Sequence, residues 1–598
     1  MPSLHYISHA VALALIAMLI RKYIELKIYH DDVMSSCYFS EANHENSEVE
    51  NEIEHETPPK APVPTSDDPR FLTPEYLNQK LFSDGSSVTC NPTDHAAQRT
   101  CHFVNLCYFA ERDSYLFFHS DKSILENIPV NRYSPTLVEL SSVTNHTYNH
   151  FNYIDMPVSA SRLFHIKWVT TSSLIIRRFK PDNLMHVIHD DILPLFQTLR
   201  HFNLAANTSD RFHYRLIFDD EWGEGPFLKL YDILSVYQPI FKSMLREAPG
   251  LTCFHQAYVG LVKSTAWYDY GFYKPQGPLP ERKVSSVEIN SLLEYTRREL
   301  GLSINTDNSD YLVLVSRKST RLILNEIELS LALSREVRTK VIHLSQEQYT
   351  IEQMIEVVSN SIGIIGMHGS LLTLAMYLPA GSILIELFPY AVNPDHYSPY
   401  KTLVSLPGMN ILYRAWRNME QKKSFGHLTM GNIEYLPHDE QQRIISQMEV
   451  PRHICCDDPS WLYHIYQDTE VDIETIISLT KEAILATKTE NNRAVDKIAT
   501  NFVIPDKVTH DSCKTMVDGS KQIIIYWEIP WNLQFFNYEI VEYEVLLQYT
   551  KSPEKSTIFR VSANSITLEP SDSFYIVWVR CCLDEIHIGP FKQIACVE

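Results

Sequence analysis

The stretch IGIIGMHGSLLTLAMYLPAGSILIELF (residues 362–388) indicates the fold class of the chain. It opens with the short apolar run 362–367, which has the length and composition of a strand buried on both faces. Residues 371–381 have an apolar helical pattern that a proline and a glycine close. A second apolar run, 382–388, follows directly. The order strand, helix, strand is typical of a parallel sheet.

The same alternation occupies the residues before this stretch. YLVLVS (311–316) and KVIHLS (340–345) predict two further strands. NEIELSLALSRE (325–336) and TIEQMIEVVSNS (350–361) predict the helices that follow them. A series of such units predicts a parallel, doubly wound sheet. The class is therefore α/β, and ligands of such sheets bind at the carboxyl ends of the strands.

The beginning of the chain predicts a membrane anchor and a stem. The apolar run 7–20 is followed by Arg21 and Lys22, and with Tyr23 and Ile24 the segment 7–24 comes close to the roughly 20 apolar residues that span a bilayer. No small-residue cleavage site follows it, so we expect a retained signal anchor, with a cleaved signal peptide as the alternative. Residues 25–84 are acidic and Pro-rich, which favours an extended stem. The formal charge of −21 argues against a nucleic-acid partner.

Sequons and cysteines favour a lumenal, oxidising compartment. Asn145 and Asn207 each begin an N-glycosylation sequon. Cys90, Cys101 and Cys107 have the spacing of a small disulfide cluster, and the later cysteines could form further bridges. Basic residues directly after the apolar run favour the opposite orientation by the positive-inside rule. We take the lumenal orientation as the expectation.

The last part of the chain, residues 501–598, has a different pattern. Aromatic and β-branched runs such as KQIIIYWEIPW (521–531) and YEIVEYEVLLQYT (538–550) follow one another with no helix between them. This spacing predicts one fibronectin type III-like sandwich. Trp527 is the expected core tryptophan, and Tyr575 is the expected corner tyrosine.

Two loops of the doubly wound region carry candidate ligands for a diphosphate. A glycine lets the backbone approach an anion closely, and an arginine can bind two phosphate oxygens at once. The candidate residues are Arg317, Arg321, Asn325, His368, Gly369 and Ser370. Taken alone, the arginine could be a surface residue and the histidine a turn residue. The chain has no G-x-x-x-x-G-K-[ST] loop and no G-x-G-x-x-G after a strand, so a nucleotide triphosphatase and a dinucleotide oxidoreductase are disfavoured.

Glu386 is a carboxylate among apolar residues, and a buried carboxylate needs a hydrogen-bond donor. A ribose hydroxyl of a bound nucleotide is one expected donor. A buried arginine is the structural alternative.

A second cluster of titratable groups lies in NLMHVIHDDILPLF (183–196). On an α-helix His186, His189 and Asp190 share one face, while Asp191 lies about 100° further round. Three interpretations remain open: a metal site, a structural His186–Asp190 pair with the other groups solvated, and a general base directed into a cleft. The proline in this stretch predicts a kink or an early helix end.

Several motifs in chain order resemble glycosyltransferase family 61, which also holds the EGF-domain O-GlcNAc transferase. They include RRFKPDNLMHVIHDDILPLFQTLR (177–200), SRKSTRLILNE (316–326), MHGSLLT (367–373) and EVPRHICC (449–456). The resemblance runs from about residue 85 to the end of the chain. It implies a GT-B fold, with two Rossmann-like halves, an interdomain cleft and the C-terminal sandwich.

The resemblance also implies an activity. An inverting enzyme would transfer GlcNAc from UDP-GlcNAc, in β-1,4 linkage, to O-linked mannose on Ser/Thr of α-dystroglycan. It would be a single-pass type II membrane protein of the endoplasmic reticulum with its catalytic domain in the lumen, and a homodimer whose sandwich helps to hold the acceptor peptide. The alternatives are an EGF-domain-type O-GlcNAc transferase of the same family and a catalytically inactive lumenal binding protein. The expected segments are a cytoplasmic tail (1–6), the anchor (7–24), the stem (25–84), an acceptor-side half (85–300), a donor-binding half (301–500) and the sandwich (501–598).

Carried onto this sequence, the resemblance implies roles for the candidate residues. UDP would be held by Arg317, Arg321, Asn325, His368, Gly369, Ser370 and Glu386. Their positive groups would replace the metal ion that a D-x-D transferase uses, so no cofactor is expected.

For the base, the resemblance favours the His189/Asp190 pair without deciding between its members. Arg177, Arg178 and Asp191 could orient the helix or the sugar. The acidic triplet at 219–221 is expected to be a solvated loop rather than a metal motif.

Overall fold

The computed structural model describes residues 75–133, 136–140, 149–202, 211–271, 274–279, 284–302, 311–491, 505–518, 520–535, 538–549, 552–568, 575–584 and 587–594. All of them belong to one compact unit, Pro64–Glu598. The expected tail, anchor and most of the expected stem lie outside the described residues, as do both sequons, Asn145 and Asn207. Within the described part of the chain, no helix is both long and apolar enough to cross a bilayer.

The folded part begins within the segment expected to be stem. Helix α2 (Glu75–Asp84) buries Leu77 and Leu81 against a core that includes Trp168. The indole of Trp168 also donates to the Asn78 side chain at 2.7 Å. Residues 75–84 are therefore part of the globular body.

The first half of the body contains a ten-stranded mixed sheet. Its main path runs β11-β10-β9-β12-β2-β1-β4, with β3, β7 and β8 attached. The strands β8 to β12 pair in parallel, whereas β12–β2 and β2–β1 are antiparallel. The bounds are β1 (Ser87–Cys90), β2 (Cys101–Phe109), β3 (Ser114–His119), β4 (Leu125–Glu126), β7 (Ile154–Pro157), β8 (Ile166–Val169), β9 (Ser173–Ile176), β10 (Arg215–Phe218), β11 (Ile240–Phe241) and β12 (Leu251–Val259).

Disulfides join neighbouring strands of this sheet. Cys90 and Cys101 are register partners of β1 and β2, and Cys107 and Cys253 are register partners of β2 and β12. The expected cluster is confirmed for Cys90 and Cys101, whereas Cys107 pairs outside it with Cys253. A third bond joins Cys455 to its neighbour Cys456, whereas Cys581 and Cys582 are buried free thiols.

Six helices of this half connect or follow the strands of the sheet. They are α3 (Leu184–His186), the π-helix η4 (Val187–Ile192), α4 (Leu193–Phe202), α5 (Leu228–Asp232), α6 (Lys242–Glu247) and α7 (Ser286–Glu299). The first three form one continuous run. Pro194 lies inside this run, just after the π turn, where the regular α-helical hydrogen-bond pattern is already interrupted, so it does not end the helix. Small pairs β5 (Val138–Glu139)–β6 (His150–Phe151) and β13 (Tyr268–Asp269)–β14 (Gly277–Pro278) complete the half.

The second half contains the expected parallel sheet, in the order β16-β15-β17-β18-β19. Four strands and their helices were expected, and a fifth strand, β19, extends the sheet at one edge. The bounds are β15 (Tyr311–Val315), α8 (Glu326–Glu336), β16 (Lys340–Leu344), α9 (Ile351–Ser359), β17 (Gly363–Met367), the 3-10 helix η5 (Ser370–Tyr377), β18 (Ile383–Phe388), α10 (Pro399–Val404) and β19 (Leu412–Arg417).

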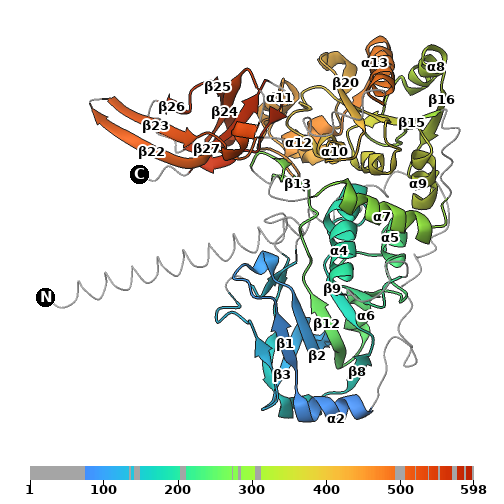
Figure 1. The fold of residues 1–598 in the computed structure, drawn as a ribbon, viewed down its shortest axis with the longest axis vertical. Helices are drawn as coiled ribbons and strands as arrows, with labels where there is room; N and C mark the ends of the chain where they lie inside the picture. The colour runs from blue at the N-terminus through green and yellow to red at the C-terminus, as the bar shows by residue number, and fades with distance from the viewer. Residues whose placement is uncertain are drawn as a thin grey trace. The chain divides into compact units, whose positions relative to one another are not determined.

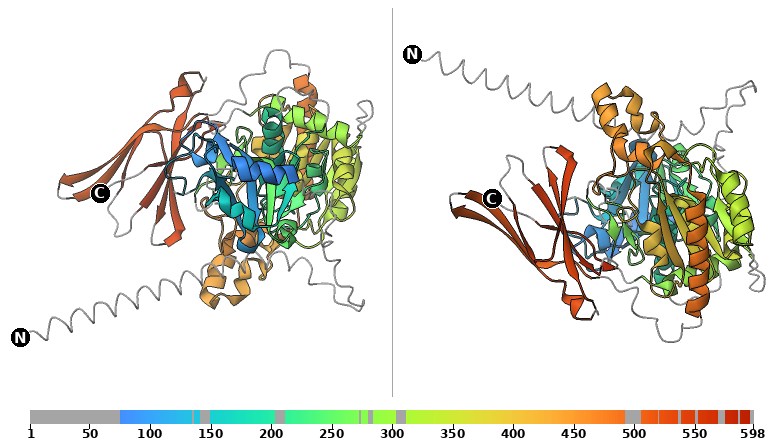
Figure 2. Two further views of the ribbon diagram at one scale, coloured as in Figure 1. Left: turned by 90° about the horizontal axis from the view of Figure 1, so that it is seen from below. Right: turned by 90° about the horizontal axis from the view of Figure 1, so that it is seen from above.

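Alternate residues of these strands pack on opposite faces of the sheet. Leu312 and Leu314 of β15 face α8 and α13 (Ile473–Asn491), as Figures 1 and 2 show for the two helices beside the sheet. Val313 and Val315 belong to the core that contains α9 and η5. The core that contains Val313 and Val315 also contains residues of α3, η4 and α4. The five-stranded parallel sheet and the helical run that carries His186, His189 and Asp190 therefore share one hydrophobic core.

A short segment after β19 connects the sheet to α13. It holds β20 (Ser424–Phe425), α11 (His438–Ile445), α12 (Pro459–Ile465) and β21 (Asp468–Thr469). The backbone of this segment returns to the loop after β15, because Thr469 N donates to Leu322 O at 2.8 Å.

The strands beyond residue 505 form two antiparallel sheets, visible as two layers in Figure 2. One has the order β22-β23-β26 and the other β25-β24-β27-β28, with β29 also on β27. Trp527 is 1% exposed in the core between them, as expected, and the side chain of Tyr575 lies outside the described residues. The bounds are β22 (Thr509–Asp518), β23 (Ser520–Glu528), β24 (Val541–Tyr549), β25 (Ser552–Val561), β26 (Ser565–Leu568), β27 (Tyr575–Leu583), β28 (His587–Ile588) and β29 (Lys592–Ile594).

Candidate functional site

The order of the parallel sheet defines where a ligand would bind. The chain forms β15, moves outward to β16 and then returns to the other side of β15 to form β17. Loops that leave the sheet at such a reversal diverge and leave room for a ligand. Arg317 follows β15 and Gly369 follows β17, so the two loops expected to bind a diphosphate lie at this point.

Gly369 and the two arginines are in close contact. A Cβ atom on Gly369 would lie 2.3 Å from Nη2 of Arg317 and 3.1 Å from Nη1 of Arg321. The φ angle of Gly369 is 166°, an extended value open to any residue. Space for the guanidinium groups, and not backbone conformation, is therefore the reason for a glycine here.

The two arginines lack a carboxylate partner among the described residues. Burial, and then the charge of Arg321, lowers the pKa of Arg317 to about 9, so its charge is destabilised in the fold. The Nε atoms of both residues are buried without a hydrogen-bond partner. Arg321 also has a left-handed backbone, with φ of 58°, which few non-glycine residues adopt. Paired cations that nothing in the described fold neutralises are suited to an anionic ligand.

Asn325 has a different place from the one expected. Its amide nitrogen donates to Val471 O at 2.8 Å, and its amide oxygen accepts from Val471 N at 2.9 Å. Both polar groups therefore fasten the start of α8 to the segment before α13. Asn325 was expected to bind UDP, and we correct this expectation to a structural role. Ser370 begins the helical turn η5 directly after Gly369.

Glu386 is fully buried and orients His368. Its Oε1 atom lies 2.5 Å from Nδ1 of His368, and its Oε2 atom accepts from the Tyr413 hydroxyl at 2.7 Å. Both donors belong to the protein, so neither a ribose hydroxyl nor an arginine is its partner. The carboxylate fixes the imidazole ring beside Arg321, which donates to the His368 carbonyl at 3.3 Å.

The His–Asp cluster lies on a wide helical turn. Residues Val187–Ile192 form a π-helix, a rare conformation often found at functional sites. His189 is fully buried, and its Nε2 atom accepts from the backbone N–H groups of Trp267 at 3.1 Å and Tyr268 at 3.2 Å. The proton of its ring is therefore on Nδ1, 2.5 Å from Asp190. With both nitrogens engaged, His189 is not placed to accept a proton from a substrate, which corrects the expected base role.

Asp190 connects two histidines. Its Oδ2 atom lies 2.8 Å from Nδ1 of His186, and its Oδ1 atom faces His189 and the Tyr270 hydroxyl, the latter at 3.2 Å. The His186 side chain is 13% exposed, whereas His189 is fully buried. The expected His186–Asp190 pair is confirmed, but the neighbouring groups are buried and not solvated.

Asp191 and the two arginines before the helix have structural partners. Asp191 accepts from the Tyr231 hydroxyl at 2.6 Å, and burial raises the pKa of Asp191 well above its ordinary value. Arg178 is buried and binds Asp220 through Nε at 3.1 Å and Nη2 at 2.7 Å.

Arg177 lies 3.1 Å from Asp219. Asp219 and Asp220 are held by these ion pairs, which corrects the expectation of a solvated loop for both, whereas the Glu221 side chain is 63% exposed.

Two groups of residues are connected by packing and hydrogen bonds. We call Arg317, Arg321, His368, Gly369 and Glu386 the phosphate-side cluster, and His186, His189 and Asp190 the base-side cluster. The ring of Tyr400 on α10 lies 5.3 Å from that of His368. Ser398, two residues earlier, donates its N–H to the Tyr268 hydroxyl at 3.0 Å. Thr373 of η5 also donates to the Met185 sulfur at 3.5 Å. The two predicted clusters therefore belong to one continuous structure.

Sequence reasoning missed several residues that shape the site: Trp267, Tyr268, Tyr270, Tyr400 and Tyr413. The dense aromatic run at 267–270 was the available signal. A separate cavity of about 320 Å³ lies at the carboxyl end of β16, with Phe227, Lys229 and Tyr349 in its wall. None of the predicted site residues lines this cavity.

The comparison with known families defines a sugar-transferring enzyme, and the chain belongs to glycosyltransferase family 61. Residues 184–385 match the family model described as Glycosyltransferase 61. Protein O-linked-mannose beta-1,4-N-acetylglucosaminyltransferase 2 of Homo sapiens is 39% identical over 528 residues, 86% of this chain and 89% of that protein. The Xenopus tropicalis protein of the same name is 39% identical over 529 residues, with the same shares covered. That of Canis lupus familiaris is 38% identical over 551 residues, 90% of this chain and 92% of that protein.

Proposed function

We propose that this glycosyltransferase moves GlcNAc from UDP-GlcNAc to mannose O-linked to Ser/Thr of α-dystroglycan-type glycoproteins, forming a β-1,4 linkage. The names of relatives 38–39% identical over most of their length support the donor sugar, the linkage and the acceptor. The observation that carries the donor site is the arginine pair at Gly369, which no carboxylate of the described residues neutralises.

In this proposal Arg317 and Arg321 bind the diphosphate of the donor. Charge-assisted hydrogen bonds from guanidinium groups would strengthen as negative charge develops on the leaving UDP. His368, held by Glu386, lies beside them and would contribute to the same electrostatic environment. No cofactor is required, because the arginines supply the positive charge that a metal ion supplies in D-x-D transferases.

The acceptor side of the proposal assigns the base to His186. The 4-hydroxyl oxygen of mannose attacks the anomeric carbon of GlcNAc from the face opposite UDP, the bond to the diphosphate breaks, and the hydroxyl proton passes to His186. Asp190 would stabilise the resulting imidazolium through its 2.8 Å contact with Nδ1. His189 would position Asp190 and connect it to the backbone of Trp267.

The architecture and the location of the protein complete the proposal. A GT-B arrangement would have its donor half in the five-stranded sheet. Two packed antiparallel sheets of three and five strands, together with buried Trp527, support a fibronectin type III-like sandwich. Disulfides within the first sheet support an oxidising compartment, here the lumen of the endoplasmic reticulum with a type II anchor. A homodimer remains part of the proposal.

The test is a transfer assay with purified protein, a panel of UDP-sugars and two acceptors, an O-mannosyl peptide and an EGF domain. We expect product only with UDP-GlcNAc and the O-mannosyl peptide, with a β-1,4 linkage by glycan analysis. Product on the EGF domain alone, or with another sugar, would replace the proposed substrates. No product with either acceptor would refute the proposed function.

Variants test the assignment of the base. His186→Gln should lower kcat by roughly 10²–10⁴-fold, the usual contribution of a general base. His201→Gln changes an exposed histidine on the same helical run and is the matched control. Normal turnover of the His186 variant would remove this residue from the mechanism.

A further inference from the structure

A buried carboxylate in the C-terminal region binds three arginines. Glu544 of β24 is the direct register partner of Arg560 on β25 and of Arg580 on β27. Arg580 lies 2.7 Å from one carboxylate oxygen and Arg560 lies 3.0 Å from the other. Strand pairing alone therefore presents an Arg–Glu–Arg row on this sheet.

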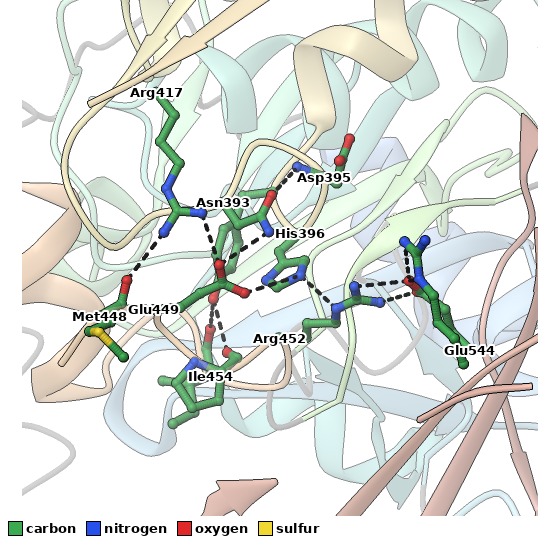
Figure 3. Close-up of polar contacts among 12 residues, drawn as sticks. Asn393, Asp395, His396, Arg417, Met448, Glu449, Arg452, Ile454 and Glu544 are labelled. Atoms are coloured by element: carbon green, nitrogen blue, oxygen red, sulfur yellow. Dashed lines mark hydrogen bonds and ion pairs between the residues drawn. The ribbon is translucent and has the colours of Figure 1, made fainter. Parts of the chain in front are cut away.

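The third arginine, Arg452, comes from the segment before α12. Both of its terminal nitrogens donate to Glu544, with Nη2 at 3.3 Å from Oε1. Its Nε atom donates to Nε2 of His396 at 2.6 Å. Figure 3 shows the Arg452 guanidinium between His396 and Glu544. We call Glu544, Arg560, Arg580, Arg452 and His396 the Glu544 cluster.

The charges in the Glu544 cluster are complementary. Burial alone would raise the pKa of Glu544, but Arg580 and Arg452 outweigh it and hold this pKa well below its ordinary value. Burial, and then Arg452, lowers the pKa of His396 well below its ordinary value. A neutral His396 accepts the Arg452 hydrogen bond at Nε2, so all three donating groups of the Arg452 guanidinium are engaged.

The His396 end of the cluster leads into the candidate active site. The next residue, Tyr397, donates its hydroxyl to Pro451 O at 3.0 Å and to Ile454 O at 2.9 Å, which joins this loop to the Arg452 segment. Ser398 then donates to the Tyr268 hydroxyl, and Tyr400 packs beside His368. Only three residues thus separate His396 from a ring that contacts the phosphate-side cluster.

The Arg452 end leads to the base-side cluster. The sulfur of Cys455, three residues beyond Arg452, lies 3.2 Å from the Tyr270 carbonyl oxygen. The Tyr270 hydroxyl in turn donates to Asp190 at 3.2 Å. Both segments that meet at the Glu544 cluster therefore continue into residues around the reaction centre.

We propose that Arg452 is a positioning residue for the transfer reaction, and that its attachment to Glu544 makes the C-terminal sheet a support for the active-site loops. The kinetic part of this inference rests on the proposed function. The C-terminal region then contributes to turnover itself, beyond any contact with acceptor. Arg560 is the contrasting member of the cluster, since its side chain is 54% exposed and it binds Glu544 from within the same sheet.

Arg452→Met tests the proposal, with Arg560→Met as the matched control. Glu544 keeps two arginines in the first variant, so no carboxylate is left unpaired. We expect the kcat of transfer and the rate of acceptor-free hydrolysis of UDP-GlcNAc to fall together by 10- to 100-fold in Arg452→Met. The Kd for UDP should stay within threefold. Arg560→Met should stay within twofold of wild type in all three measurements, and Arg452→Lys should be intermediate.

Hydrogen exchange gives a readout that does not depend on activity. Arg452→Met should speed amide exchange at Trp267, Tyr268 and Ser398 while exchange in β15 and β17 stays at the wild-type rate. Wild-type exchange at the three amides would overturn the proposal even if the protein proved to have no transferase activity. A change confined to the KM for the acceptor peptide would also overturn it, because the C-terminal region would then act only in docking.

A second pair of variants covers a failure of Arg452→Met to fold. His396→Gln retains an oxygen that can accept from Arg452, and His396→Leu does not. We expect near-normal kcat in the first and at least a tenfold loss in the second. Equal kcat in the two variants would overturn the proposal.

Discussion

Substitution of Gly369 by alanine separates ligand binding from folding at the arginine pair. The added Cβ would lie 2.3 Å from Nη2 of Arg317, so the guanidinium must move. The displaced atom is the far end of a flexible side chain, and a strained rotamer costs only about 0.5–1.5 kcal/mol. We expect Gly369→Ala to fold with nearly the wild-type melting temperature.

The effect on UDP binding should be much larger than the effect on folding. A hydrogen bond between charged groups contributes roughly 1.5–3 kcal/mol. Loss of one such bond between Arg317 and the diphosphate therefore raises the Kd for UDP roughly 10- to 150-fold. If Arg321 also moves, since the new Cβ would lie 3.1 Å from its Nη1, the loss approaches the upper end of this range.

Calorimetric titration with UDP and thermal unfolding of the same samples measure the two effects. Gly223→Ala is the neutral control, because no atom lies within 4 Å of its added Cβ. Gly366→Ala is the opposite control, because its Cβ would lie 2.8 Å from Val315 Cβ in the sheet, which should destabilise the fold by about 1–3 kcal/mol without moving the arginines. Wild-type affinity for UDP in Gly369→Ala would refute the diphosphate site.

Three further predictions concern stability and metal dependence. Because burial raises the folded pKa of Asp191, the stability that this residue contributes is present at low pH and is lost as pH rises above about 4. In urea unfolding, Asp191→Asn should therefore stabilise the protein more at pH 7.5 than at pH 5. An equal gain at the two pH values would contradict this. Arg178→Met leaves the Asp220 carboxylate, 6% exposed, with two backbone N–H donors but no cation, and should cost about 3–5 kcal/mol in urea unfolding. The more exposed Arg177→Met should cost less, and equal losses would contradict the assignment. Transfer should proceed unchanged in EDTA, and a loss that Mn²⁺ or Mg²⁺ restores would show that a metal ion takes part.

The doubly wound sheet could be predicted because its strands are buried on both faces. Each predicted strand of that region agrees with the structure to within one residue at either end, for example 362–367 against Gly363–Met367. The strand Leu412–Arg417 was missed because it is an edge strand, only partly buried, with arginines among its apolar residues. Arg317 and Gly369 could be placed together because both follow strands of a doubly wound sheet, whose carboxyl ends bind the ligand. This rule needs no side-chain detail.

The base-side cluster could not be predicted to the same depth. The spacing argument assumed 3.6 residues per turn, whereas Val187–Ile192 form a wider π turn. The decisive partners of His189 are backbone N–H groups of Trp267 and Tyr268, 78 and 79 residues away in sequence. No local pattern reports such contacts, so the sequence identified the cluster and favoured the His189/Asp190 pair for the base, although both ring nitrogens of His189 are engaged within the protein.

The mixed sheet of the first half was missed for a related reason. Its parallel strands β9 and β10 were readable as apolar runs, but β12 pairs with parallel neighbours and with antiparallel β2 along its length. Which strand joins which edge depends on contacts between segments about 150 residues apart, as with Cys107 and Cys253.

The π turn has a consequence for how the protein can vary. One extra residue in a helical turn rotates the residues before it by about 100° relative to the residues after it. Removal of Val187 would shorten the turn, bring His186 and Asp190 from four residues apart to three, and rotate the residues before the deletion relative to His189. Insertions and deletions in this short segment are therefore expected to be far more damaging than substitutions at most of its positions, because they change the rotation of a whole segment and not a single side chain.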